Sequence, residues 1–328
     1  MALDTTKLAQ PSVSSDLILG TAQLGLAYGV ANRAGMPSED DGIALVREAL
    51  QSGIRGIDTA RAYGDAERRI GLACPPGSPA VPIVTKLDPL EHIPPEVAPE
   101  IAVNAARASL EASRAALLRH RVDTLLLHRA QHRTTWGGAV WDMLRSERDA
   151  GGIGNLGVSV QTPSEALAAL DDRDVRHVQL PFNLLDRRWA DAGVIDALRN
   201  RSDIVVHVRS VLLQGLVDSP ATRWPTIPGL DPSQIVDHLQ RLAGAFNRRS
   251  IIDVAVAFVR AHNWIDGIVI GMETREQLVS NIALFTQPAL TADETSYAQA
   301  TMPRLPIALL DPANWPKESV MTALEGRS

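Results

Sequence analysis

The sequence is poor in aromatic residues, which make up only 4% of its 328 positions. Leu, Ile, Val and Ala must therefore fill the core, and branched aliphatic side chains are the ones that fill the layered interior of a (β/α)₈ barrel. The single cysteine, Cys74, excludes an internal disulfide. No cluster of metal-ligating residues stands out, so we expect no bound metal.

Long runs of one residue type are also missing. No apolar run approaches the ~20 residues that cross a bilayer, and the polar segment Met1–Ser15 lacks the apolar centre of a signal peptide. The 32 basic and 38 acidic residues give a net charge of −6 without a long basic run, which argues against nucleic-acid binding. These absences predict a cytoplasmic protein with no membrane or nucleic-acid partner.

Short apolar runs alternate with helical patterns along most of the chain, and this alternation predicts a parallel sheet. The expected helices include Asp41–Gln51, Pro99–Arg119 and Ile251–His262. The expected strands are Leu17–Gly20, Ile54–Asp58, Pro82–Lys86, Thr124–His128, Gly157–Val160, His177–Leu180, Ile204–Val208 and Gly267–Ile270. Eight strands favour a closed barrel over an open doubly wound sheet. We predict an extension at 1–15, a single (β/α)₈ barrel at 16–301 and an irregular tail at 302–328.

Ionisable residues end three successive predicted strands: Asp58, Lys86 and His128. In (β/α)₈ barrels the C-terminal ends of the strands carry the active site, so these side chains should converge at one mouth. The proline- and glycine-rich loop Val217–Pro232, which includes Trp224, is long enough to fold over that mouth.

The segment around Asp58 reads Asp58-Thr59-Ala60-Arg61-Ala62-Tyr63-Gly64, and it resembles the D-T-A-x-x-Y-G signature of the aldo-keto reductases. Val84–Lys86 is similar to the lysine strand of that family, Leu125–His128 to its histidine strand, and Gly157–Ser159 to the segment that holds the nicotinamide carboxamide. The resemblance runs in order from Leu17 to Phe285. It implies a (β/α)₈ barrel that reduces an aldehyde or ketone with NADP(H) or NAD(H), as a monomer or small homo-oligomer.

The resemblance implies a catalytic tetrad of Asp58, Tyr63, Lys86 and His128. A carbonyl that accepts hydride needs a proton donor, and a free phenol is a weak acid that titrates near ~10. A lysine ammonium ~4 Å away favours the phenolate by at most ~4 kcal/mol, from which desolvation subtracts. Asp58 would keep Lys86 charged, and His128 would donate a hydrogen bond to the substrate oxygen. A purely structural Asp58–Lys86 salt bridge is the alternative.

The resemblance also assigns residues to the cofactor. The expected cofactor-binding residues are Thr21, Ser159, Gln179, Arg209, Ser210, Gly271, Glu273, Arg275, Gln277 and Asn281. Gln277 and Asn281 match the residues that hold the adenine. Glu273 stands where many members bind the 2′-phosphate of NADP, and a carboxylate there suits a free 2′-hydroxyl. Arg275 offers phosphate binding instead, and Glu273 is alternatively a first-turn acid at a helix start. The choice between NADH and NADPH therefore stays open.

Two positions depart from the family pattern. Arg209 stands where an aromatic residue usually stacks on the nicotinamide, and Val160 replaces a common asparagine. A planar guanidinium can stack on a ring, but it can equally bind an acidic substrate group or a cofactor phosphate. These departures keep open a non-redox epimerase or lyase, and the family resemblance also allows a cofactor-binding regulatory barrel with little turnover.

Three further motifs are weighed. Gly152–Gly157 matches G-x-G-x-x-G but follows a helical stretch, so we interpret it as a turn rather than a dinucleotide site. His128 and His132 are spaced as zinc ligands on a helix, but no third ligand is apparent. The Phe182–Arg188 segment is either a loop held by ion pairs or a source of Arg187 and Arg188 for substrate or cofactor. With Gly20–Gly25, the Gln179–Asp186 segment resembles members linked to sugar metabolism, which implies a sugar or sugar-derived carbonyl as substrate.

Overall fold

The computed structural model describes residues 16–29, 32 and 35–315. Eight parallel strands form a closed barrel in sequence order, and β1 pairs with β8 to complete the ring. The strands are β1 (Leu17–Gly20), β2 (Ile57–Asp58), β3 (Ile83–Lys86), β4 (Val122–Leu127), β5 (Ile153–Ser159), β6 (His177–Pro181), β7 (Val205–Arg209) and β8 (Gly267–Gly271). The predicted (β/α)₈ barrel is confirmed.

Two strand predictions were wrong in their bounds. Ile54–Gly56 is not part of β2, because the Ile54 N–H instead donates to the Ala49 carbonyl at the end of the preceding helix. The Gly152–Gly157 segment is largely strand rather than turn, since β5 begins at Ile153 and pairs with β4. A Cβ on Gly154 or Gly157 would lie 2.4 or 2.1 Å from a backbone oxygen of the adjacent strand. These glycines therefore permit close strand approach.

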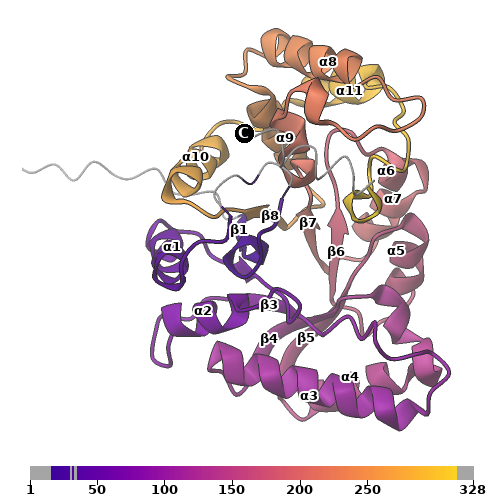
Figure 1. Ribbon diagram of the computed structural model, residues 1–328. Coiled ribbons are helices and arrows are strands. Elements are labelled where there is room, and N and C mark those ends of the chain that lie inside the picture. The colour runs from indigo at the N-terminus through magenta and orange to yellow at the C-terminus, as the bar shows by residue number, and fades with distance from the viewer. Residues whose placement is uncertain (1–15, 30–31, 33–34, 316–328) are drawn as a thin grey trace, which may run out of the picture.

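The helices surround the strands, and α10 lies beside α1 where the ring closes (Figure 1). Side-chain caps define several helix starts: Ser38 accepts from the Asp41 N–H, and Thr162 forms a capping box with Glu165. The helices are α1 (Glu39–Gln51), α2 (Ala66–Ala73), α3 (Pro99–Leu117), α4 (Ala139–Asp149), α5 (Pro163–Leu170), α6 (Arg188–Asp191), α7 (Val194–Arg199), α8 (Pro232–Ala245), α9 (Ile251–Arg260), α10 (Arg275–Phe285) and α11 (Ala292–Thr301). The three predicted helices end within about two residues of these bounds.

The core is aliphatic, as the low aromatic content predicts, with Leu19, Ile57 and Val178 among its fully buried residues. Polar side chains interrupt it within the strands. His177 of β6 and His207 of β7 are both buried, with ring centroids 4.3 Å apart. Burial lowers the pKa of His207 to about 4, although the charge of Asp58 opposes this shift. Both rings are therefore neutral at neutral pH.

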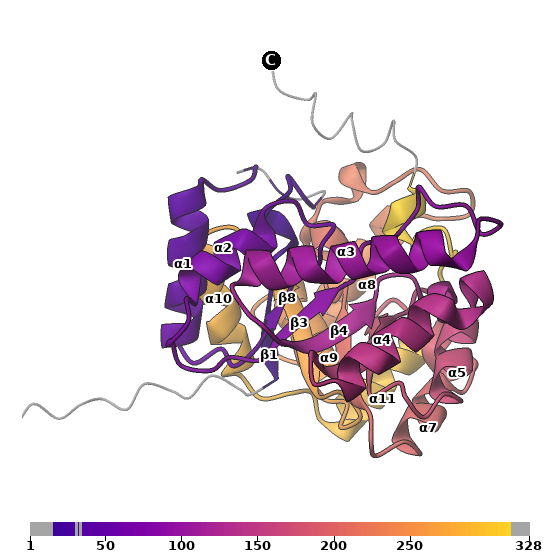
Figure 2. The same ribbon diagram turned by 90° about the horizontal axis from the view of Figure 1, so that it is seen from below.

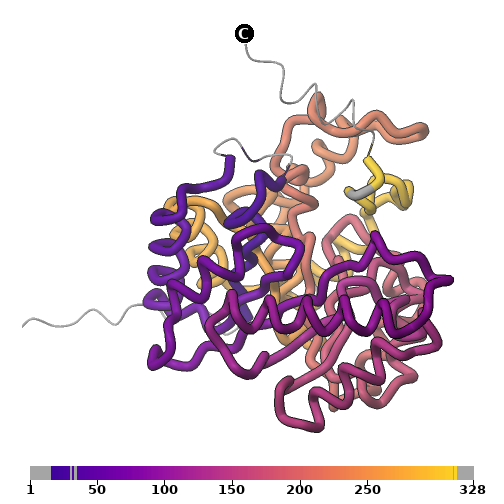
Figure 3. The backbone as a smooth tube through the Cα atoms, turned by 60° about the horizontal axis from the view of Figure 1, so that its bottom comes forward, coloured from indigo at the N-terminus to yellow at the C-terminus, as the bar shows by residue number. Residues whose placement is uncertain are grey.

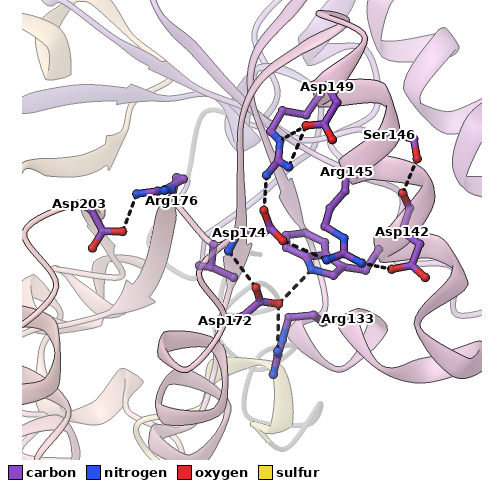
Figure 4. A network of polar contacts seen from close by, with 12 residues as sticks. Arg133, Asp142, Arg145, Ser146, Asp149, Asp172, Asp174, Arg176 and Asp203 are labelled. Atoms are coloured by element: carbon purple, nitrogen blue, oxygen red, sulfur yellow. Dashed lines mark hydrogen bonds and ion pairs between the residues drawn. The ribbon is translucent and has the colours of Figure 1, made fainter.

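An outer ion-pair network ties α4 to the connection between α5 and β6 (Figure 4). Asp174 accepts from Arg148 at 2.7 Å and from Arg145 at 3.0 Å, and Asp172 accepts from the Trp141 indole at 3.0 Å. The Arg148 and Arg145 guanidiniums lower the pKa of Asp174 against the effect of partial burial. Partly exposed pairs of this kind contribute little individually, so we interpret the network as fixing the orientation of α4.

The segment after β7 and the C-terminal segment up to Trp315 lie on the same side of the molecule (Figures 2 and 3). The described part of the predicted tail contains a single short 3₁₀ turn, Pro312–Asn314, and its Leu309, Leu310 and Trp315 side chains are buried. The tail is thus mostly irregular yet packed on the barrel as far as it is described. The predictions for residues 1–15 and 316–328 fall outside the described residues.

Candidate active site

A cavity of about 1310 Å³ opens at the C-terminal ends of the strands. Every strand except β6 places a residue at or just past its end in the cavity wall, namely Gly20, Asp58, Lys86, His128, Ser159, Arg209 and Gly271. Asp218 and Arg223 from the loop after β7 also line it. Parallel strands in a closed barrel bring their ends to one mouth, so the predicted convergence of Asp58, Lys86 and His128 is what the fold produces.

Lys86 forms the charged centre of the cavity floor. Its ammonium donates to Asp58 Oδ1 at 2.7 Å and to the Thr59 carbonyl at 2.9 Å, and its side chain is only 1% exposed. Burial alone would lower the pKa of Lys86, but the charge of Asp58 and the nearby Tyr63 outweigh it and raise that pKa. Lys86 is therefore a permanent cation whose only ion-pair partner among the described residues is Asp58.

The turn that follows β2 carries Tyr63 to this cation. The Tyr63 N–H donates to the Ala60 carbonyl, and Gly64 follows with a φ of 51°. A Cβ at Gly64 would lie 2.4 Å from the Gly25 carbonyl oxygen, so the turn requires glycine. The Lys86 ammonium lies 5.1 Å from the centroid of the Tyr63 ring. Tyr63 thus lines the cavity beside a buried positive charge.

His128 lies next to Tyr63 in the cavity wall, with the two ring centroids 6.0 Å apart in an edge-on arrangement. Burial, the Lys86 charge and the Arg209 charge together lower the pKa of His128 to about 3. A neutral imidazole has one N–H donor and one acceptor nitrogen. At neutral pH, His128 can therefore donate a hydrogen bond to a ligand but cannot serve as a cationic acid.

Two buried side chains support the floor in ways that the sequence did not indicate. Gln179 donates from Nε2 to Asp58 Oδ2 at 2.6 Å, so both oxygens of the carboxylate are bound. Glu67 is fully buried and accepts from Arg61 at 2.6 Å and from the Thr85 hydroxyl at 2.7 Å. Arg61 and Thr85 flank Tyr63 and Lys86 in the sequence, so Glu67 ties the turn to β3.

The β7 end of the cavity contains Arg209 and a loop in unusual conformations. Arg209 Nη2 donates to the Val160 carbonyl at 3.2 Å and to Gln161 Oε1 at 2.9 Å, across to the end of β5. The next residue, Ser210, and then Leu213 and Gln214 have φ values of 59°, 44° and 56°. Non-glycine residues rarely occupy this left-handed region, and they cluster where function requires a fixed loop shape.

The β8 end provides the acidic corner of the cavity. Glu273 and Gln277 bind each other twice: the Glu273 N–H donates to Gln277 Oε1 at 2.8 Å, and Gln277 Nε2 donates to Glu273 Oε1 at 2.9 Å. Burial raises the pKa of Glu273, and the hydrogen bond from Gln277 opposes this shift. Ser280 and Asn281 of α10 line the same part of the wall.

The structure places most of the predicted cofactor residues in the cavity wall and two outside it. Those in the wall are Thr21, Ser159, Arg209, Ser210, Gly271, Glu273, Gln277 and Asn281. Gln179 is buried behind the wall against Asp58, and Arg275 is turned outward to Glu48 of α1 at 2.7 Å. Arg187 and Arg188 are also engaged elsewhere, with the Gln299 carbonyl and with Asp186. The Phe182–Arg188 loop is therefore held by one ion pair, Arg188–Asp186, and by hydrogen bonds.

Several cavity residues were missed from the sequence. Gln23 lies in the Gly20–Gly25 segment, which was considered for its family likeness, Tyr28 lies just beyond that segment, and Gln161 follows the predicted end of a strand. Loop residues carry no periodicity, so position alone could have singled out only Gln161. Within the described residues, no group of three or more His, Cys, Asp or Glu side chains is placed to hold a metal. No helix in the same part of the chain is long and apolar enough to cross a membrane.

A (β/α)₈ barrel with a buried lysine–aspartate pair, a tyrosine and a neutral histidine at its mouth defines a class of carbonyl-reducing oxidoreductases. The model of the aldo/keto reductase family matches residues 16–302. The chain therefore belongs to the aldo/keto reductase family.

Solved structures agree on the fold. An aldo-keto reductase from Bacillus halodurans, described in its holo form, matches with a TM-score of 0.69 at 20% identity, covering 88% of this chain and 93% of that one. A thermostable aldo-keto reductase in complex with the inhibitor epalrestat matches with a TM-score of 0.65 at 18% identity, covering 87% and 94%. No curated protein sequence matches significantly.

Proposed function

We propose that the protein reduces an aldehyde or ketone to an alcohol with a nicotinamide dinucleotide, and that Tyr63 donates the proton. The observation that carries the proposal is the buried Lys86 ammonium, which is paired with Asp58 and lies 5.1 Å from the Tyr63 ring at the cavity floor. The overall reaction converts one carbonyl, one reduced nicotinamide and one proton into one alcohol and one oxidised nicotinamide. A sugar or sugar-derived substrate remains a prediction from the family resemblance.

Each member of the tetrad has a separate task in this proposal. Negative charge develops on the carbonyl oxygen as the carbon is reduced, and Tyr63 releases its phenolic proton to that oxygen. The Lys86 charge stabilises the phenolate that remains, while Asp58 keeps Lys86 protonated. Neutral His128 donates a hydrogen bond to the same oxygen and orients the carbonyl. The phenolate then regains a proton from solvent through the open cavity.

The cavity suits a dinucleotide. Its volume exceeds the ~300–1000 Å³ of an ordinary small-molecule pocket, which leaves room for a cofactor and a substrate together. Gln179 Oε1 is buried without a hydrogen-bond partner among the described residues, and Gln179 pairs in register with Ser159. Ser159, which lines the cavity, would hold the carboxamide with Gln179 buried behind it, and Gln277 and Asn281 would hold the adenine. When bound, the reduced cofactor supplies the hydride.

The acidic corner supports NADH as the preferred cofactor. Glu273 lines the cavity, whereas Arg275 points outward to Glu48. A carboxylate can accept a hydrogen bond from a ribose hydroxyl but repels a phosphate. The Arg275–Glu48 pair is exposed and therefore weak, so Arg275 could leave it. The proposed preference for NADH therefore depends on the Glu273 carboxylate rather than on Arg275 being held away from the cavity.

Titration of the purified protein with NADH and NADPH, followed by tryptophan fluorescence, tests both the binding of a nicotinamide cofactor and the preference for NADH. We expect saturable binding of both, with NADH bound at least about tenfold more tightly, a difference of ~1.4 kcal/mol. Glu273→Lys should reverse the preference, and Glu273→Gln should abolish most of it. Tighter NADPH binding by the wild-type protein would refute the NADH preference. If neither nucleotide binds, the reductase proposal fails, and non-redox acid–base chemistry becomes the better account.

Cofactor binding without turnover would point to the regulatory alternative. Consumption of NADH with a panel of aldehydes and ketones, combined with identification of the alcohol products, distinguishes the two. A conversion of substrate that leaves the nicotinamide unoxidised would instead support an epimerase or lyase.

A further inference from the structure

Three arginines line the cavity: Arg129, Arg209 and Arg223. Arg129 is paired with Glu91, Arg223 has no ion pair among the described residues, and Arg209 alone of the two unpaired ones is held by hydrogen bonds to neutral groups. Arg209 is half-buried, and no carboxylate of the described residues lies within ion-pair distance of it; its partners are the Val160 carbonyl, the Gln161 side chain and the Ser210 hydroxyl. Guanidinium stays charged in proteins, and a charge partly withdrawn from water without a counterion is costly. The Arg209 guanidinium thus lacks a counterion among the described residues.

The hydrogen bonds leave two nitrogens of the Arg209 guanidinium available. Nη2 uses both of its N–H groups, on the Val160 carbonyl and on Gln161 Oε1. Nη1 makes only a long contact of 3.4 Å with the Ser210 hydroxyl, and Nε has no partner among the described residues. The free N–H groups of Nη1 and Nε point in different directions, so each can donate one charge-assisted hydrogen bond to a carboxylate or phosphate oxygen.

Neighbouring acids do not fill this role. Asp311 accepts from Gln161 Nε2 at 3.1 Å and from Asn314 at 2.7 Å. Glu165 accepts from the Gln161 and Thr162 N–H groups at the start of α5. Asp218 lines the cavity but lies beyond ion-pair distance of Arg209. The oxyanion that completes the site is therefore expected to enter with a ligand.

The position of Arg209 decides which ligand this is. Its charge contributes, after burial and Lys86, to the low pKa of His128, so it lies close to the reacting end of the cavity. The acidic Glu273 corner, to which the resemblance assigns the adenosine, is at β8. The left-handed residues Ser210, Leu213 and Gln214 fix the loop around Arg209. An anion bound here would lie beside the carbonyl carbon rather than beside the adenosine.

We propose that Arg209 binds an oxyanion of the substrate, and that the protein acts on carbonyl compounds that bear a carboxylate or a phosphate. This inference rests on the proposed reductase function and narrows its substrate class. The oxyanion accepts a hydrogen bond from Nη1, whose observed contact is the long one with the Ser210 hydroxyl, while the carbonyl oxygen meets Tyr63 and His128. The same contact sets the orientation of the substrate, because it fixes a second point of attachment.

The test compares charged and neutral substrates of otherwise similar structure. The carboxylate pair is para-carboxybenzaldehyde and benzaldehyde; the phosphate pair is glyceraldehyde phosphate and glyceraldehyde. For the wild-type protein we expect kcat/KM for the charged member of one pair to exceed that of its neutral partner by about 10- to 100-fold, the range for a charged hydrogen-bonded contact. The pair that shows the preference identifies the oxyanion.

The variants are Arg209→Met, Arg209→Lys and, as a matched control, Arg223→Met, which removes another cavity arginine without an ion pair among the described residues. We expect the charged-to-neutral ratio to fall toward one in Arg209→Met, to recover in part in Arg209→Lys and to persist in Arg223→Met. Because the ratio compares two substrates on one variant, a general loss of folding does not mimic this result. Tryptophan-fluorescence titration should give similar NADH dissociation constants for the wild-type and Arg209→Met proteins.

Three results would overturn the inference while leaving the reductase function intact: equal kcat/KM for both members of each pair in the wild type, a ratio that survives in Arg209→Met, or a ratio lost only in Arg223→Met. A large loss of NADH affinity in Arg209→Met with an unchanged ratio would assign the arginine to the cofactor and also overturn it. Absence of NADH and NADPH binding together with absence of reduction would refute the proposed function, and the inference with it.

Discussion

Replacing one member of the buried Lys86–Asp58 pair should lower the free energy of unfolding strongly, because the other charge is left uncompensated. Replacing both members should lower it by less than the sum of the two single effects. In Lys86→Met the Asp58 carboxylate stays buried with only the Gln179 amide, at 2.6 Å, among its observed side-chain partners. In Asp58→Asn the ammonium, which is 1% exposed, loses its counterion. Breaking a buried pair by deleting one partner typically costs ~3–5 kcal/mol, because the remaining charge is uncompensated. We expect each single substitution to lower the free energy of unfolding by an amount in this range.

The double variant Asp58→Asn/Lys86→Met removes both charges and should be destabilised by less than the sum of the two single effects, by at least ~2 kcal/mol. Urea unfolding, followed by tryptophan fluorescence and circular dichroism, measures all four free energies of unfolding. Since a protein of this kind is stable by only ~5–15 kcal/mol, the single variants should remain measurable. Single costs below ~1 kcal/mol, or additive effects, would refute the view that Lys86 depends on Asp58 for its charge.

Two further variants test the barrel interior and the turn before α2. His207 has a pKa of about 4 in the folded state, below the ~6.5 of an unfolded histidine, so the unfolded state binds more protons as the pH falls below ~6.5. As the pH falls from about 7 to about 5, His207 alone should therefore lower the free energy of unfolding by ~2 kcal/mol. Urea unfolding of His207→Leu should show a correspondingly shallower dependence of this free energy on pH. The same dependence in the variant and the wild type would contradict the burial argument. Gly64→Ala should lower the free energy of unfolding by ~1–3 kcal/mol, because φ is 51° and the new Cβ meets the Gly25 carbonyl. Thermal unfolding measures this effect. Gly77→Ala is the control for backbone strain alone, because Gly77 also has a positive φ but has open space around it.

The sequence was a good guide where structure is periodic. Strands that alternate with helices, together with ionisable residues at three successive strand ends, were enough to predict the closed barrel and to place Asp58, Lys86 and His128 at one mouth. The errors fell where local backbone geometry decides. Ile54–Gly56 has an apolar start, yet its backbone bonds to the end of α1, and the glycines of β5 serve close strand packing rather than a turn.

Contacts between distant side chains were beyond this reasoning. Nothing in the sequence near Gln179 indicates that its amide reaches Asp58, 121 positions away, or that Arg275 is drawn to Glu48, 227 positions away. The absence of a counterion for Arg209 among the described residues was equally unpredictable, because it depends on which carboxylates the fold brings near. The candidate site residues thus followed from sequence pattern, whereas their partners followed from the fold.

The central claim is that Tyr63 donates the proton to a reduced carbonyl. The most direct test is the rate of aldehyde reduction by Tyr63→Phe under saturating NADH, measured together with the NADH dissociation constant. We predict a loss of about 10²- to 10⁴-fold in rate, the usual contribution of a general acid, with cofactor affinity close to that of the wild type. A variant that binds NADH normally and reduces the aldehyde at the wild-type rate would show that the proton comes from elsewhere.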